Sequence, residues 1–176
     1  LLDTFDLKAF DKGNRDEVVQ KWIGSLRTYW TGDGFSLWKG GHHVNEYVTG
    51  YVLMAMAEAE AAGYDVPTPL TEKTIDAVED IVQDRSDRPE YYSDDVWRDT
   101  RAFMLFALAR HDTALESEIN GLANHPPESV EGKTHLLRTL LQTDQPDLPD
   151  TQTALARQLA NRVQKDDNSA HLTAPD

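Results

Sequence analysis

The chain has 176 residues and a net charge of −14, from 31 acidic and 17 basic residues, and it contains no cysteine. That length is sufficient for one domain with its own core. The acidic excess disfavours a nucleic-acid partner, because phosphates are bound by lysine and arginine. The lack of cysteine excludes disulfides, thiolate nucleophiles and cysteine metal sites.

No stretch of the sequence is apolar over the length that a membrane span needs, so we expect no direct membrane span. The first residues, Leu-Leu-Asp-Thr, lack the basic start and the apolar middle of a signal peptide. We therefore expect a mature protein or an excised fragment. The acidic residues are spread along the chain, which is typical of a solvated surface.

The hydrophobic pattern predicts about seven helices and no strand. The first helix is predicted to begin at Asn14, an N-cap that Glu17 would reach back to. A glycine-rich turn follows at 32–41 and carries Phe35 and Trp38, which are large enough that we expect the turn to be folded onto a core. The apolar face of the first helix is predicted to be Val19, Trp22, Ile23, Leu26 and Trp30.

The second helix is predicted over 44–62 and stops at Gly63, a usual C-terminal residue. Thr68 is the predicted N-cap of the third helix, with Pro69 at its first position and its end near residue 85. The predicted apolar stripes are Val44, Tyr47, Val48, Tyr51, Val52 and Ala55 in the second helix, and Ile75, Val78, Ile81 and Val82 in the third.

The fourth helix, predicted over 95–110, contains the run 102–109, which is apolar on every side. A helix of this kind is surrounded by other helices. The segment after residue 165 is polar and aperiodic. The predicted N-caps of the last three helices are Thr113 (in a capping box with Glu116), Ser129 and Asp150.

Helices that are apolar or alanine-rich alternate with helices that are apolar on one side only. This order predicts an all-α protein made of antiparallel helix pairs, with inner and outer helices alternating as in part of an α/α toroid. We assign 1–165 to this helical portion. The segment 166–176 is then a polar C-terminal tail or the start of the next segment.

Residues 29–67 carry a longer pattern. A turn with Asp-Gly and aromatic residues ends in tryptophan, a helix opens with Val-Thr-Gly-Tyr-Val, and an alanine-rich stretch closes on Gly-Tyr-Asp-Val-Pro. The pattern resembles the thioester domain of bacterial α2-macroglobulin-like proteins, relatives of the complement thioester proteins, although Gly50 stands where the family usually has alanine. The segment 98–110 resembles the inner helices of that family. The signature positions are Asp33, Gly34, Phe35, Trp38, Thr49, Tyr51, Gly63, Tyr64 and Pro67.

The resemblance implies an α/α toroid and a role in trapping proteases. In the family, a protease cleaves a bait region, and the strained thioester of a Gly-Cys-Gly-Glu-Gln motif then acylates the attacker. No such motif is present in this sequence, so either the chain begins after the motif or the parent protein has lost it. We therefore expect no enzyme activity, no catalytic residue and no cofactor in this chain.

The resemblance also implies partners and a location. The expected partners are the other domains of a macroglobulin-like parent and, through that parent, target proteases. The expected location is extracytoplasmic, in the periplasm or at the cell surface, with a lipid anchor on the parent as one means of attachment.

A possible functional surface lies near the start of the second helix, where His42, His43 and Glu46 are close in sequence. The His-x-x-Glu spacing puts two ligand types on one helix face. Zinc needs three or four ligands, and no third is nearby, so we expect no metal site. An exposed turn is the plainer interpretation, and a role beside a reactive site of the parent is the alternative.

Two other functions remain open from the residues alone. One is a fragment of an α/α-toroid enzyme of the terpene-cyclase or carbohydrate-active kind. In such an enzyme Asp94 and Asp95 would be part of an acidic catalytic motif, whereas the plainer interpretation is that they cap a helix. The other is a helical-repeat interaction scaffold. Arg98 and Arg101 are expected to form weak surface ion pairs with nearby aspartates. The aromatic residues that could line a sugar or lipid groove, but that we expect in the core, are Trp22, Trp30, Trp38, Tyr47, Tyr51 and Trp97.

Overall fold

A computed structural model describes residues 12–84, 89–143, 148–165 and 170–172. In these residues the fold is helical apart from one short antiparallel hairpin near the C-terminus. None of the described helices has the length and hydrophobicity of a membrane span. The elements are α1 (Lys12–Ser25), a 3-10 turn (Leu26–Thr28), α2 (Glu46–Ala61), α3 (Thr68–Gln83), α4 (Asp94–Ala109), α5 (Glu116–Asn124), α6 (Val130–Gln142), α7 (Pro149–Ala160), β1 (Val163–Lys165) and β2 (Ala170–Leu172).

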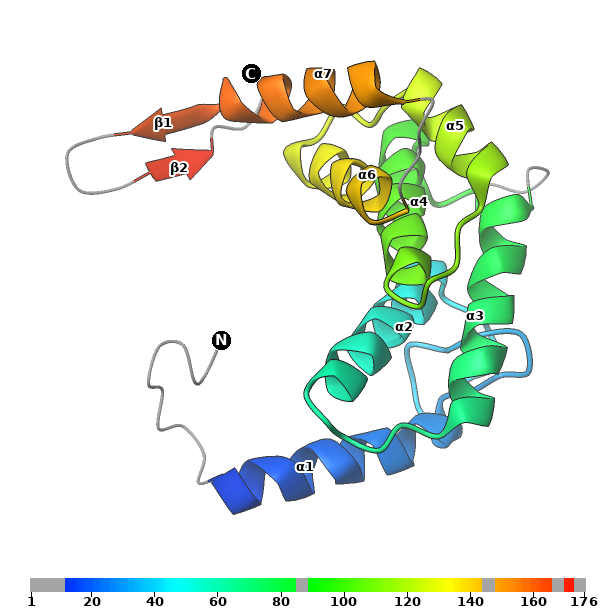
Figure 1. Ribbon diagram of the computed structural model, residues 1–176. Helices are drawn as coiled ribbons and strands as arrows, with labels where there is room; N and C mark the ends of the chain where they lie inside the picture. Colours follow the sequence, from blue (N-terminus) through cyan, green and yellow to red (C-terminus); the bar gives the residue numbers. More distant parts are fainter. Residues whose placement is uncertain (1–11, 85–88, 144–147, 166–169, 173–176) are drawn as a thin grey trace.

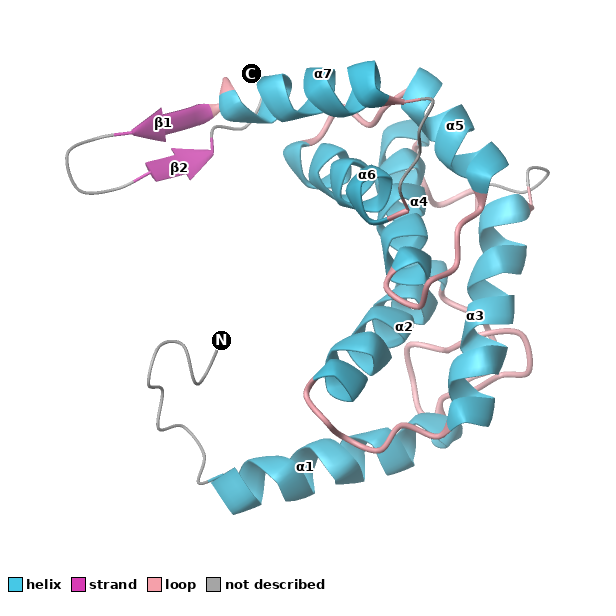
Figure 2. Ribbon diagram, viewed as in Figure 1, coloured by secondary structure: helices cyan, strands magenta, loops and turns pink. Residues whose placement is uncertain are grey.

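The helices form an arc of two layers (Figures 1 and 2). Helices α2, α4 and α6 line the inner side, where α4 packs against both α2 and α6. Helices α3, α5 and α7 lie outside them, and each packs against at least one inner helix. The predicted alternation of inner and outer helices is confirmed, and the fold is part of an α/α toroid.

Helix α4 lies at the centre of the main core. Its side chains from Ala102 to Ala109 are all less than a tenth exposed, whichever way they point. A helix with no polar face is stable in water only when other helices surround it, and α2, α3, α5 and α6 do so here. The apolar run therefore determined the position of this helix in the fold.

A second core cluster joins α1, the glycine-rich turn, α2 and the start of α3. Val52, Met56 and Ala59 face it from α2, whereas Leu53 of the same helix faces the main core. Helix α2 thus contributes to both clusters. The remaining buried members of the second cluster are Ile23, Leu26, Phe35, Val66 and Leu70.

The close approach of α2 and α4 explains the glycine at position 50. A Cβ added to Gly50 would lie 2.8 Å from Cγ of Met104, which is fully buried. Carbon atoms that are not bonded to each other do not approach so closely without displacement, so a larger residue would separate the two inner helices. Gly50 therefore reflects how closely these helices pack.

Several local predictions were wrong at helix ends. Asn14 lies inside α1, which already includes Lys12, so it is not the N-cap. Thr113 does not cap α5, because Leu115 takes that position and no side chain bonds there. Asp150 lies in the first turn of α7, where it meets the positive end of the helix dipole, but Leu148 is the N-cap. Ser129 does cap α6, by accepting from the Gly132 amide at 2.8 Å.

The predicted apolar faces also needed correction. Tyr47 and Tyr51 are 44% and 57% exposed, and the buried side of α2 is formed instead by smaller residues. Trp38 is 73% exposed, although Phe35 beside it is fully buried. The hairpin β1–β2 was not predicted, because strands of three residues carry too little pattern to detect.

An ion pair between Arg101 and Glu118 joins helices α4 and α5. Arg101 was predicted to pair with a nearby aspartate, so its partner was predicted wrongly. The Glu118 side chain is 8% exposed. Removing the charge with Glu118→Gln should lower the free energy of unfolding by about 2 kcal/mol or more, because a guanidinium in a water-poor contact loses its counter-charge. Urea unfolding of both proteins measures the difference.

The exposed pair between Arg98 and Asp95, at 2.9 Å, provides the matched control. Asp95→Asn removes the same charge from the first turn of α4, and we expect a loss of only about 0.5 kcal/mol. Equal losses for the two variants would contradict the role assigned to burial at Glu118.

Candidate functional site

The glycine-rich turn is held by a small set of buried hydrogen bonds. The Phe35 amide donates to Oγ1 of Thr49 at 3.0 Å, and that hydroxyl donates to the Asn45 carbonyl at 2.8 Å. A Cβ at Gly34 would lie 2.8 Å from Cγ1 of Val44 and 3.0 Å from Thr49 Oγ1, so the backbone approaches α2 too closely for a side chain. Three of the signature residues thus form one contact that fixes the turn to the helix.

The other signature residues divide into two groups. Gly63 ends α2 with φ of +85°, a conformation that glycine adopts without strain, and the Tyr64 hydroxyl donates to Asp16 of α1 at 2.7 Å. Pro67 leads into α3. Asp33, Trp38 and Tyr51 are exposed, so packing does not account for them.

The structure brings the three residues of the proposed functional surface to one place. His42, His43 and Glu46 line an open depression of about 550 Å³ beside the turn. Among the described residues, no group of three or more histidine, cysteine, aspartate or glutamate side chains has the geometry of a metal site. Sequence reasoning missed Tyr91, which joins this surface from the loop before α4.

Glu46 and Tyr91 are the polar pair of this surface. The Tyr91 hydroxyl donates to Oε2 of Glu46 at 2.6 Å. Partial desolvation of its hydroxyl raises the pKa of Tyr91, although most of the side chain is exposed, and the hydrogen bond to Glu46 raises the pKa further. The tyrosine therefore stays protonated and acts as a donor that fixes the carboxylate.

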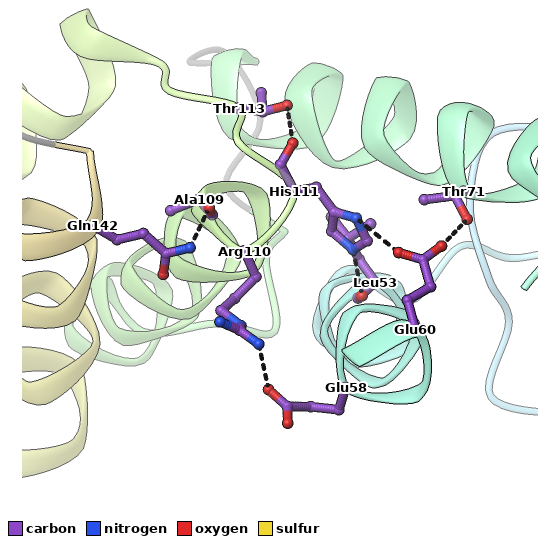
Figure 3. A network of polar contacts seen from close by, with 9 residues as sticks. All are labelled: Leu53, Glu58, Glu60, Thr71, Ala109, Arg110, His111, Thr113 and Gln142. Carbon is purple, nitrogen blue, oxygen red and sulfur yellow. Dashed lines mark hydrogen bonds and ion pairs between the residues drawn. The ribbon is translucent and has the colours of Figure 1, made fainter. Parts of the chain in front are cut away.

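A second polar cluster joins the inner helices at the other end, where α4 ends (Figure 3). The Gln142 side chain of α6 donates to the Ala109 carbonyl at 2.7 Å, and Arg110 lies 3.2 Å from Glu58 of α2. His111 Nε2 bonds the Leu53 carbonyl of α2 at 3.0 Å. The Gln142 contact satisfies a carbonyl group that the end of α4 leaves free, and the other two contacts tie that end to α2, so the cluster is structural.

His111 extends this cluster to the outer layer. Its Nδ1 lies 3.9 Å from Glu60, whose other oxygen accepts from Thr71 of α3 at 3.4 Å. The histidine side chain is only 7% exposed, and its ring is therefore not available to a ligand. Figure 3 shows the ring pointing between α2 and the loop that follows α4.

A row of rings crosses the three inner helices. Tyr47 of α2 stacks on Phe103 of α4 with ring centroids 5.3 Å apart, and His135 of α6 contacts both Phe103 and Phe106, at 5.2 and 5.7 Å. Arg138 lies 4.0 Å above the Phe106 ring, within the range of a cation–π contact. The row ties α2, α4 and α6 together.

The pH dependence of stability should report on this row. Burial lowers the pKa of His135 below its ordinary 6.5, and Arg138 adds to the effect, while Glu131 and Asp99 oppose it. Below pH 6.5 the unfolded chain therefore binds a proton on this histidine that the folded chain resists, so folding stability falls as the pH drops through that region. Urea unfolding at pH 7.5 and pH 5.5 measures the loss.

His135→Gln serves to separate this histidine from other titrating groups. The variant should lose less stability than the unmutated chain between the same two pH values. Its free energy of unfolding at pH 7.5 should already be lower, because a ring contact is gone. The assignment fails if both proteins lose the same amount.

These observations define a class of structure, namely part of an α/α toroid whose inner and outer helices are fixed by a glycine–aromatic turn and by polar contacts at the helix ends. Solved structures with a similar fold include bacterial alpha-2-macroglobulins. The trypsin-activated protein of Escherichia coli superposes with a TM-score of 0.77 at 21% identity, over 90% of this chain and 11% of that one.

Two further structures of bacterial alpha-2-macroglobulins superpose on this chain in the same way. A structure of the Escherichia coli protein spanning domain MG7 to the C-terminus gives a TM-score of 0.74 at 20% identity, over 89% of this chain and 26% of that one. Salmonella alpha-2-macroglobulin reacted with methylamine gives 0.75 at 19% identity, over 95% and 11%. No family model matches the sequence, and neither does any curated protein. The chain thus has the fold of a small part of those much longer chains.

Proposed function

We propose that the chain is part of the thioester-type domain of a bacterial alpha-2-macroglobulin-like protease inhibitor. The observation that carries this proposal is the superposition of nine-tenths of the chain on the trypsin-activated Escherichia coli protein. The sequence signature supports it, because the signature residues Gly34, Phe35 and Thr49 are those that fix the turn to α2.

In this proposal the chain is a helical interaction module without chemistry of its own. It supplies helix pairs that hold a reactive segment located elsewhere in the parent, and it contacts proteases only through that parent. We assign residues 1–165 to the helical domain and 166–176 to its tail or to the next segment, although the hairpin of β1 and β2 crosses this boundary. The parent acts outside the cytoplasm, where it meets foreign proteases.

The match to the segment from MG7 to the C-terminus supports a position late in the parent chain. Because the trypsin-activated and the methylamine-reacted proteins both superpose on this chain, its helices have the arrangement that is found after both treatments. A module with this property is suited to supporting a reactive segment that lies elsewhere in the parent.

Protease capture by the complete gene product that contains these residues tests the proposal. We expect incubation with trypsin to yield a complex that survives denaturing electrophoresis, and pretreatment with methylamine to abolish it. Trypsin whose active site has been blocked is the control, since capture should require cleavage.

Three other results are informative. Covalent capture that methylamine does not affect would rule out thioester chemistry. If the gene product captures no protease at all, the assignment of the fold still holds, but the proposed inhibitor function is rejected. Hydrolysis of a glycan or cyclisation of a prenyl diphosphate by the purified chain would favour the α/α-toroid enzyme instead.

A further inference from the structure

The depression beside the glycine-rich turn has features that an architectural module does not need. Two of its rings are open to solvent, since Trp38 is 73% and Tyr91 is 68% exposed. Leu37, at 55%, adds an aliphatic wall. Side chains of this size rarely stay exposed together without a partner. Among the described residues, the lining also includes Ser36, Gly41, Val44 and Asn45.

An acidic group is fixed in the same depression. Glu46 contributes the only carboxylate among the described residues that line it, and the Tyr91 hydroxyl donates to one of its oxygens at 2.6 Å. This contact orients the carboxylate and leaves its other oxygen available. Glu46 lies in the first turn of α2, where Asn45 already accepts from the Val48 amide at 2.9 Å. The helix end therefore needs no anion from outside.

We propose that this depression binds a cationic side chain, lysine or arginine, of a partner polypeptide. Aromatic faces attract cations through the negative potential above the ring, and a carboxylate beside them supplies the counter-charge. The aliphatic stem of lysine or arginine would pack on Leu37 and Trp38 while its charged end reaches Glu46. A net charge of −14 favours the approach of a basic segment.

The lysine next to Trp38 in the sequence is not the cation that we propose for the depression. Lys39 follows Trp38 directly, but it is exposed and does not line the depression. A metal ion is a poorer occupant, because the described residues provide no group of three ligands here. The inference stands on this depression alone and does not depend on the proposed function.

Peptide binding to the complete chain tests the inference. The probes are acetyl-Gly-Arg-Gly-amide, acetyl-Gly-Lys-Gly-amide and acetyl-Gly-citrulline-Gly-amide, in which citrulline has the shape of arginine without its charge. We expect the two cationic peptides to shift the backbone amide signals of residues 36–46 in nuclear magnetic resonance titrations. The citrulline peptide should not shift them at the same concentrations.

Three variants locate the site. Glu46→Gln and Trp38→Leu should each weaken the cationic peptides by about threefold, the size expected for an exposed ion pair or cation–π contact. Glu72→Gln, which removes the same charge from an exposed position on α3, should change binding by much less. Thermal unfolding confirms that each variant is folded.

The outcomes distinguish a specific cation site from a general response to negative charge. Equal weakening by Glu46→Gln and Glu72→Gln would mean that the peptides respond only to the overall negative charge, and the site would be rejected. Equal shifts with citrulline would reject recognition of a cation. Failure of protease capture by the parent would leave this inference untouched, because the peptide titration uses a different readout.

Discussion

Replacing Gly132 with alanine should lower the free energy of unfolding by about 2–3 kcal/mol, although alanine normally strengthens a helix by up to about 1 kcal/mol. A Cβ at this position of α6 would lie 2.5 Å from Cβ of Pro127 and would also overlap the Asp99 carboxylate of α4. Asp99 accepts from Ser129, the N-cap of the same helix, at 2.8 Å. The substitution thus disturbs both the packing of α6 and its cap.

Urea unfolding measures this loss, and Gly121→Ala is the matched control. Gly121 lies in α5, and a Cβ there would meet no atom within 4 Å. We expect that variant to gain about 0.5–1 kcal/mol through the reduced entropy of the unfolded chain. A gain at both positions would contradict the close contact between α4 and α6.

Truncating the buried ring of the glycine-rich turn has the largest effect that we expect. Phe35→Ala should lower the free energy of unfolding by about 3–5 kcal/mol, because it empties a fully buried site. The ring also makes an edge contact with Trp30, with centroids 5.1 Å apart. Trp38→Ala removes a larger ring from the same turn and should change stability by less than about 0.5 kcal/mol.

Circular dichroism during urea unfolding compares the two variants directly. A similar loss for both would show that Trp38 contributes to the core, contrary to its exposure. A small loss for Phe35→Ala would show that the turn is not folded onto the core, and the interpretation of the signature would change with it.

The sequence was most informative where hydrophobic residues covered a helix completely. The run from Ala102 to Ala109 predicted a central helix, and α4 is that helix. Helix ends were predicted less well, because a cap depends on backbone geometry that residue type only favours. Ser129 satisfies that geometry, whereas Thr113 bonds the His111 carbonyl instead.

Predictions about aromatic residues failed for a related reason. Size alone suggested that Trp38 would be buried, but the turn that places Phe35 inside directs Trp38 outward. His42 and His43 precede α2 and do not share a helix face with Glu46, although all three residues line the depression beside the turn. Tyr91 could not be found from spacing, because it lies 45 residues from Glu46 in the chain and meets it only through the packing of α2 and α4.

The division of the core into two clusters determines how this arc can come apart. Each helix contacts mainly its neighbours, so opening at the α1 end exposes only the cluster around Phe35 and Met56. The cluster around α4 then remains covered. Amide hydrogen exchange should therefore be faster in α1 than in α4. The arc should unfold stepwise, beginning at the α1 end, and not in a single cooperative step.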